Sequence, residues 1–336
     1  MNILFAITGI AFALFVAFLF SFDRKKIDFK KTLIMIFIQV LIVLFMMNTT
    51  IGLTILTALG SFFEGLINIS KAGINFVFGD IQNKNGFTFF LNVLLPLVFI
   101  SVLIGIFNYI KVLPFIIKYV GIAINKITRM GRLESYFAIS TAMFGQPEVY
   151  LTIKDIIPRL SRAKLYTIAT SGMSAVSMAM LGSYMQMIEP KFVVTAVMLL
   201  AFISLMEAIN IMFGSVGLNF KQLIGYVFAP IAFLMGIPWS EAVPAGSLMA
   251  TKLITNEFVA MLDFKNVLGD VSARTQGIIS VYLVSFANFG TVGIIVGSIK
   301  GISDKQGEKV ASFAMRLLLG STLASIISGS IIGLVL

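Results

Sequence analysis

Long stretches without a charged side chain constrain this chain more than any other feature of its sequence. About 20 consecutive apolar residues in a helix cross the roughly 30 Å hydrocarbon core of a bilayer. Charge-free runs of that size or longer occur at Asn2–Phe22, Thr32–Phe63, Asn85–Ile110, Leu165–Ile188, Thr275–Ile299 and Leu317–Leu336. Membrane-spanning strands would be shorter and would alternate apolar and polar residues. The sequence therefore predicts an all-α integral membrane protein, built as a multi-span helical bundle.

The composition agrees and narrows the chemistry. Only 12% of the residues are charged, against about 25% in soluble domains, so the chain cannot face water on all sides. It contains neither Cys nor His, which excludes thiol and imidazole nucleophiles and His-ligated metals. We therefore expect no cofactor and no metal.

The net charge of +10 fits a membrane protein better than a nucleic-acid-binding protein. Lys and Arg gather in short cytoplasmic loops between spans. The loop at residues 22–31 carries five of them and only two acidic residues. We expect this loop to be cytoplasmic, with the N-terminus outside and the opening run acting as a first span rather than a signal peptide. The bilayer is thus an expected partner, and nucleic acid is not.

Two segments are too polar for simple spans and instead resemble re-entrant helical hairpins. The first hairpin is Leu133–Pro158 and the second is Ile237–Phe264, each with two short arms around a polar tip. Arms of about ten residues cannot each cross a bilayer. Each hairpin precedes a span interrupted by small or polar residues, Leu165–Ile188 and Gly277–Ile299. This repeated order predicts two inverted repeats, each with a hairpin and a broken helix, and a binding site where they meet.

The same pattern divides the chain into four regions. They are scaffold spans and amphipathic helices at 1–131, the first repeat at 132–192, a linking segment of a fused span and an amphipathic helix at 193–236, and the second repeat at 237–336.

Glu148 and Glu257 are the sharpest functional candidates because each lies at a hairpin tip in apolar surroundings. A carboxylate there costs about 2.5–3.5 kcal/mol or more, so it needs water, a partner or a substrate. A structural cap or an ion pair within the bundle would also explain such a residue. Both repeats place one there, which favours a functional role.

Further polar side chains flank these carboxylates. Gln146 and Asn256 could bind substrate edges or satisfy free backbone amides at the tips. Asn288 and Thr291 share one helical face beside the break of the second repeat. Amides at half-helix ends can receive polar ligands.

Several motifs resemble the signature segments of the concentrative nucleoside transporter family. They are Gly145-Gln-Pro-Glu148, Ala250–Ala260 (ATKLITNEFVA), Val284-Ser-Phe-Ala-Asn288 and Phe228–Glu241. The similarity runs nearly end to end and is strongest to the bacterial NupC-type branch.

The resemblance implies a secondary active transporter of a bacterial inner membrane, working as a homotrimer. It would import nucleosides by symport with a cation. The expected substrates are pyrimidine nucleosides such as uridine, and adenosine is a further candidate. The family's base-binding positions fall on Gln146 and Glu148, with Met180 lining the base pocket. Its ribose-binding positions fall on Glu257, Asn288 and Thr291, with Phe286 beside the sugar. Asn256 takes a structural role at the tip.

One departure from the family concerns the coupling ion. Sodium-coupled members commonly offer an Asn and a Ser side chain where this chain has Thr141 and Ala175. We therefore expect H+ rather than Na+, with Glu148 or Glu257 as the proton carrier. Thr141 remains a candidate for ion contact.

A second departure concerns Val193–Phe213, which runs straight through where relatives have the end of one span, a loop and the start of the next. Two spans look fused near Met198–Leu200. If so, one crossing is missing and the second repeat would enter the membrane with the wrong orientation. The alternatives are a deliberate deletion, a defective gene that encodes an inactive family member, or residues missing from the sequence.

Other functions remain open at this stage. The chain could carry nucleobases or another small polar solute. A membrane enzyme such as a prenyl transferase is disfavoured, because its acidic metal-binding Asp-x-x-Asp pair is absent from the sequence.

Overall fold

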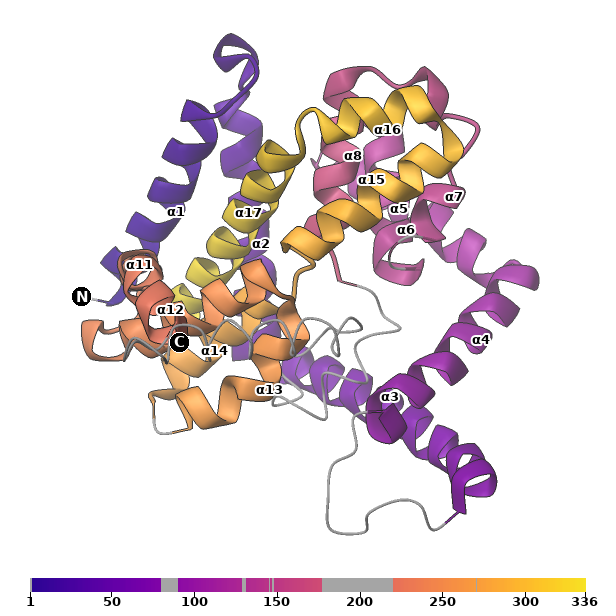
Figure 1. The fold of residues 1–336 in the computed structure, drawn as a ribbon, viewed down its shortest axis with the longest axis horizontal. Helices are drawn as coiled ribbons and strands as arrows, with labels where there is room; N and C mark the ends of the chain where they lie inside the picture. Colours follow the sequence, from indigo (N-terminus) through magenta and orange to yellow (C-terminus); the bar gives the residue numbers. More distant parts are fainter. Residues whose placement is uncertain are drawn as a thin grey trace.

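The computed structural model describes residues 2–79, 90–128, 131–144, 146, 148–176, 220–269 and 271–336 (Figure 1). Over these ranges the chain is helical and contains no strand, which confirms the predicted all-α bundle. The N-terminal helices are α1 (Asn2–Leu19), α2 (Phe29–Asn48), α3 (Thr50–Phe78), α4 (Leu95–Tyr109) and α5 (Val112–Thr128). The first repeat contributes α6 (Arg132–Phe144), α7 (Glu148–Leu151) and α8 (Arg162–Ser174). The remaining helices are α11 (Phe220–Leu234), α12 (Trp239–Ile254), α13 (Glu257–Leu268), α14 (Ala273–Leu283), α15 (Phe289–Ile302), α16 (Asp304–Ala311) and α17 (Ala314–Val335).

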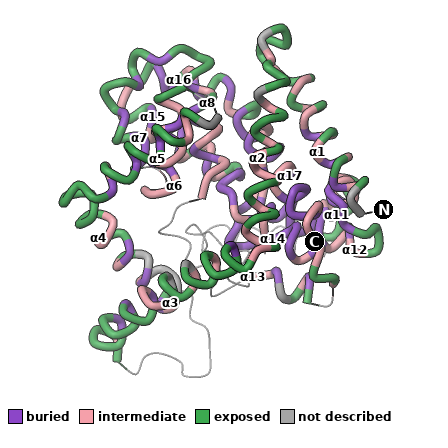
Figure 2. The backbone as a smooth tube through the Cα atoms, turned by 180° about the vertical axis from the view of Figure 1, so that it is seen from behind, coloured by how far each residue is buried: buried purple, intermediate pink, exposed green. Residues whose placement is uncertain are grey.

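Several of these helices have the length and hydropathy of membrane spans. Within the described ranges, α3 and α17 are each long and apolar enough to cross a membrane, with 29 and 22 residues. Two pairs of consecutive helices are long and apolar enough only when taken together. Helices α4 and α5 are bent by 78° at the break between them, and α11 and α12 by 117°. The apolar parts of α1, α2 and α15 are shorter than these spans. Figure 2 shows α3 and α4 exposed along most of their length, as expected for helices that face lipid rather than a soluble core.

The buried side chains form two apolar cores. The first core joins α11, α12, α13, α14 and part of α17. The second core joins α6, α7, α8, α15, α16 and the start of α17. Figure 1 shows the two groups side by side, with α17 running between them. Helix α17 therefore connects both halves of the molecule.

The interrupted span of the second repeat is divided between these two cores. Helix α14 ends at Leu283 and α15 begins at Phe289, after the capping residue Asn288. Side chains of α14 pack in the first core, whereas Ile295 and Ile299 of α15 pack in the second. The break thus carries the chain from the hairpin of its own repeat to helices of the first repeat.

The hairpin tips also break where the sequence predicts. In the second hairpin, α12 ends at Ile254 and α13 starts at Glu257. In the first hairpin, α6 ends at Phe144 and the four-residue α7 starts at Glu148, while Gly145 and Pro147 lie outside the described residues.

Parts of the first repeat and the linking segment cannot be compared with their predictions. Helix α8 ends at Ser174, inside the predicted interrupted span. Met180 and Val193–Phe213, including the predicted fusion near Met198–Leu200, fall outside the described residues. The four-region division of the chain stays a prediction.

A glycine turn produces the sharp bend between α11 and α12. Gly236 has φ of +100°, a left-handed conformation that favours glycine. Its N–H donates to the Phe233 carbonyl, and the Ile237 N–H donates to the Ala232 carbonyl. These two bonds are the Schellman ending of a helix. Pro238, which follows, cannot continue α11.

After this bend, α11 and α12 pack very closely through two glycines. A Cβ added at Gly246 would stand 2.6 Å from the Gly225 carbonyl oxygen and 2.8 Å from the Ala229 nitrogen. Both obstacles are backbone atoms, which cannot move aside as a flexible side chain can. Small residues at helix crossings commonly permit this approach in membrane proteins.

We expect Gly246→Ala to lower the thermal unfolding temperature of the protein in detergent. Overpacking of this kind costs about 1–3 kcal/mol. Gly297→Ala on α15 is the matched control, because nothing lies within 4 Å of its added Cβ. Alanine is the better helix former by about 1 kcal/mol, so the control should unfold at the same or a higher temperature. Equal losses in both variants would contradict the close α11–α12 crossing.

Candidate functional site

The strongest polar contact at the predicted site joins the second hairpin to the broken span. Glu257 is the first residue of α13 and only 4% exposed. Its Oε2 accepts a hydrogen bond of 2.8 Å from Asn288 Nδ2. Asn288 Oδ1 accepts a bond of 2.8 Å from the Thr291 N–H and so caps α15. One amide side chain therefore fixes both a helix start and a buried carboxylate.

Asn256 caps the neighbouring helix. Its Oδ1 accepts bonds of 3.0 Å from the N–H groups of Phe258 and Val259. The start of a helix leaves N–H groups without intrahelical partners and carries a partial positive charge. Asn256 satisfies two of these groups, and Glu257 brings its negative charge to the same end.

Two more predicted residues lie next to the Glu257–Asn288 pair. Thr291 is in the first turn of α15 and is 5% exposed. Phe286, 8% exposed, lies in the break, and its carbonyl accepts a 2.9 Å bond from the Asn288 N–H. The structure thus brings Glu257, Phe286, Asn288 and Thr291 together around the break between α14 and α15.

The predicted residues of the first hairpin lie at α7, among the helices of the other core. Gln146 is half-buried and donates its side-chain amide to the Gly172 carbonyl in α8. Glu148 is exposed at the first position of α7. Helix α15, whose first turn carries Thr291, packs against both α7 and α8. This helix links the two groups of predicted residues.

Thr141 and Ala175 lie where the first repeat is interrupted. Thr141 is fully buried in α6, and its hydroxyl donates a 2.8 Å bond to the Phe137 carbonyl of the same helix. Ala175 is the capping residue at the end of α8 and has extended backbone. Together they offer a single side-chain oxygen.

Sequence reasoning missed Tyr150, which lies beside Gln146. Tyr150 is fully buried and packs against Phe137, with ring centroids 5.3 Å apart. A Cβ added at Gly172 would stand 2.6 Å from the Tyr150 hydroxyl and 3.5 Å from Gln146 Nε2. Only a residue without a side chain fits there. The run of small residues around Gly172 was the available signal.

Sequence reasoning also missed Lys252, the most buried charge in the second hairpin. It is 0% exposed, and its Nζ donates to the Tyr282 carbonyl at 2.6 Å and to Ser285 Oγ at 2.8 Å. A third bond of 3.3 Å reaches Ser325 Oγ on α17. Lys252 is the only charged residue between Glu241 and Glu257 in the sequence. A lone charge in so apolar a segment was the signal that it must have partners.

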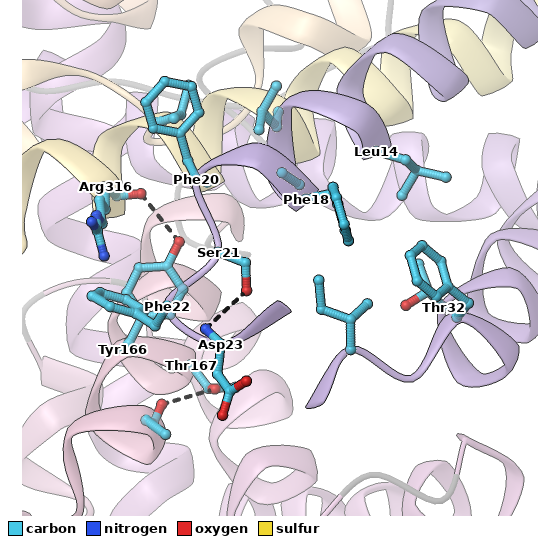
Figure 3. Close-up of a pocket in the computed structure, with 17 residues that line it drawn as sticks. Leu14, Phe18, Phe20, Ser21, Phe22, Asp23, Thr32, Tyr166, Thr167 and Arg316 are labelled. Atoms are coloured by element: carbon cyan, nitrogen blue, oxygen red, sulfur yellow. Dashed lines mark hydrogen bonds between the residues drawn. The ribbon is translucent and has the colours of Figure 1, made fainter. Parts of the chain in front are cut away.

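A cavity of about 500 Å³ lies away from these residues. It is lined by the end of α1, the loop to α2, the start of α2, and the N-terminal parts of α8 and α17 (Figure 3). Tyr166 donates from its hydroxyl to the Arg316 carbonyl at 3.1 Å, and its ring meets Phe22 edge-on at 5.3 Å. None of the predicted substrate residues that the structure describes lines this cavity. Within the described ranges, no group of three Asp or Glu residues could hold a metal ion.

Three family profiles together match most of the chain. The profile described as "Na+ dependent nucleoside transporter C-terminus" matches residues 162–333, and its N-terminal counterpart matches residues 8–81. A third, described as "Nucleoside recognition", matches residues 90–191.

Curated relatives cover almost the whole chain. The Purine nucleoside transport protein NupG of Bacillus subtilis is 30% identical over 99% of this chain and 99% of its own length. The Nucleoside permease NupC of Helicobacter pylori is 26% identical over 98% of this chain and 97% of its own length.

These relatives are longer than this chain. The NupG alignment runs over 396 positions, whereas the chain has 336 residues, so about 60 positions have no residue here. A deficit of that size would accommodate two partial spans and a loop, at about 20 residues for a full span.

The solved structures agree with the sequence comparisons. The structure of CNTnw in an inward-facing substrate-bound state superposes with a TM-score of 0.92 and 26% identity, over 100% of this chain and 98% of CNTnw. Profiles, relatives and structure all describe transporters rather than enzymes. The chain therefore belongs to the concentrative nucleoside transporter family.

Proposed function

We propose that this protein imports nucleosides across the inner membrane of a bacterium, as a homotrimer and by symport with a proton. The observation that carries the proposal is the buried Glu257–Asn288 pair at the break of the second repeat. A carboxylate accepts hydrogen bonds from hydroxyls, and an amide both donates and accepts. Vicinal ribose hydroxyls present the matching donors and acceptors.

The pair supports ribose recognition because it is already rigid. Asn288 is held by the Thr291 N–H while it donates to Glu257 Oε2. The second carboxylate oxygen, Oε1, is then the acceptor for a sugar hydroxyl. A sugar without that hydroxyl would leave a buried charge unsatisfied, and such sites reject the poorer analogue strongly.

The nucleobase would lie toward the first hairpin. Glu148 is the first residue of α7, and Gln146 lies two residues before it. Helix α7 packs against α15, the helix that Asn288 caps. The family resemblance adds Met180, which lies outside the described residues, to the proposed base-binding residues. Uridine is the proposed substrate, and the name of the Bacillus relative makes adenosine the first purine to compare.

Proton coupling is favoured by the poor supply of oxygen ligands near the first hairpin. Thr141 contributes one hydroxyl, already bonded to the Phe137 carbonyl, and Ala175 contributes none. Glu148 or Glu257 would carry the proton. One charge moved through about 100 mV supplies about 2.3 kcal/mol, which supports roughly a fiftyfold gradient.

One observation favours a second candidate, a family member that binds but does not transport. The chain lacks about 60 positions that its relative NupG has. Binding in detergent without uptake in proteoliposomes would support this candidate over active import.

We expect Glu257→Gln and Asn288→Ala each to weaken uridine binding by about ten- to a hundredfold. Each change removes a hydrogen bond that involves a charged group, worth about 1.5–3 kcal/mol. Isothermal titration of purified protein with uridine, adenosine and uracil measures the affinities. Asp263→Asn, on the same helix, is the control, because Asp263 pairs with Lys221 at a partly exposed position. Near-normal uridine affinity in both test variants would remove the pair from the site, and preference for uracil would favour a nucleobase carrier.

We expect uptake by proteoliposomes to follow an imposed pH gradient. Replacing sodium by choline should leave the initial rate unchanged, and a protonophore should abolish accumulation. A steep dependence on sodium at fixed pH would overturn proton coupling and point to ligation by backbone carbonyls.

A further inference from the structure

We infer that Lys252 is a tethered cation that holds the break of the second repeat and thereby positions Glu257 for the ribose. This inference rests on the proposed nucleoside site but concerns a residue outside it. Lys252 is a positioning residue, because it acts on the substrate through Glu257.

The bonding of Lys252 is that of an ammonium ion. Its Nζ has three acceptors, the Tyr282 carbonyl and the hydroxyls of Ser285 and Ser325, at 2.6, 2.8 and 3.3 Å. An ammonium group has three donors, so the number of acceptors matches. The Nζ also lies 4.3 Å from the centroid of the Tyr282 ring, a favourable cation–π distance. A buried charge is tolerated only with such partners.

These partners come from two parts of the chain, the broken span and α17. Tyr282 is in the last turn of α14, Ser285 is in the break that follows, and Ser325 is on α17. Lys252 itself lies two residues before the end of α12. The ammonium thus joins the first arm of the hairpin to the broken span and to α17.

The position of the ammonium is one where a free cation would be expected. The last carbonyls of a helix lack partners and carry a partial negative charge. In transporters with broken helices, such carbonyls coordinate the coupling ion. Here the Tyr282 carbonyl receives the lysine instead. The second break therefore carries its own cation and needs none from solution.

Lys252 and Glu257 hold the same break from two sides. Lys252 binds Ser285, and Glu257 binds Asn288 three residues later. Lys252, near the end of α12, and Glu257, at the start of α13, carry opposite charges in the same hairpin, and opposite charges in apolar surroundings attract each other. Without the ammonium, Glu257 would be a buried charge with no compensating cation beside it, and the break that carries Asn288 would lose its anchor to α12.

The first test compares two nucleosides in Lys252→Met, which keeps the length of the side chain and removes its charge. The wild type should prefer uridine to 3′-deoxyuridine by at least tenfold, because Glu257 is aimed at the sugar. In Lys252→Met this preference should fall at least fivefold. A purely structural role would weaken both nucleosides equally and leave their ratio unchanged, which would overturn the inference.

Two further variants keep this test decisive. Ser325→Ala removes one acceptor and should lower the same ratio in a protein that still folds, even where Lys252→Met does not. An unchanged ratio in Ser325→Ala, when Lys252→Met cannot be purified, would overturn the inference. Lys221→Met is the control, because Lys221 pairs with Asp263 at a partly exposed position on α11. Its ratio should equal that of the wild type.

A double-variant cycle separates this inference from the proposed function. Thermal unfolding is measured for Lys252→Met, Glu257→Gln and the combined variant, without nucleoside. The combined loss should be clearly smaller than the sum of the single losses, because removing both charges leaves neither uncompensated. Additive losses would overturn the inference. A smaller combined loss in a protein that binds no nucleoside would support the Lys252 anchor and overturn the proposed function instead.

Discussion

Helix ends inside an apolar protein are the constraint on which this structure depends. Each break exposes N–H and carbonyl groups, and lipid offers them no partners. At the second hairpin, Asn256 accepts a hydrogen bond from an N–H group at the start of α13. At the break that follows, Asn288 accepts one from an N–H group at the start of α15. Lys252 binds the carbonyl end of α14. The same groups that make the breaks stable gather the polar side chains from which a solute site can be built.

The break of the second repeat also determines how the two halves of the molecule meet. Because α14 packs in the first core and α15 in the second, the residues between them lie at the boundary. Asn288 is therefore held by neighbours from both sides, α13 through Glu257 and α15 through Thr291. If α14 and α15 formed one continuous helix, both would pack in one core, and no polar groups would lie at the boundary between the two cores.

Much of this arrangement could be predicted from the sequence, because helix breaks leave local signals. Asn256, Glu257 and Asn288 stood out as polar residues at the tips and breaks of apolar segments. Lys252 and Tyr150 did not, because their roles depend on contacts with residues far along the chain, such as Ser325 for Lys252 and Gly172 for Tyr150. A pattern of types and spacings predicts where a helix stops, but not which distant helix supplies the partner.

The difference between sequence pattern and packing also matters for the link between the repeats, which the sequence predicts to be shortened. Counting crossings along the chain predicts that a missing span would separate Glu257 from the first hairpin. The described helices are arranged by packing instead: α15 lies against α7 and α8, and α17 contributes to both cores. The hydrogen bonds described above for Lys252, Glu257 and Asn288 join residues of the second repeat, from Lys252 to Ser325. This network therefore lies within the second repeat, and the connection between the repeats affects how that repeat meets the first hairpin.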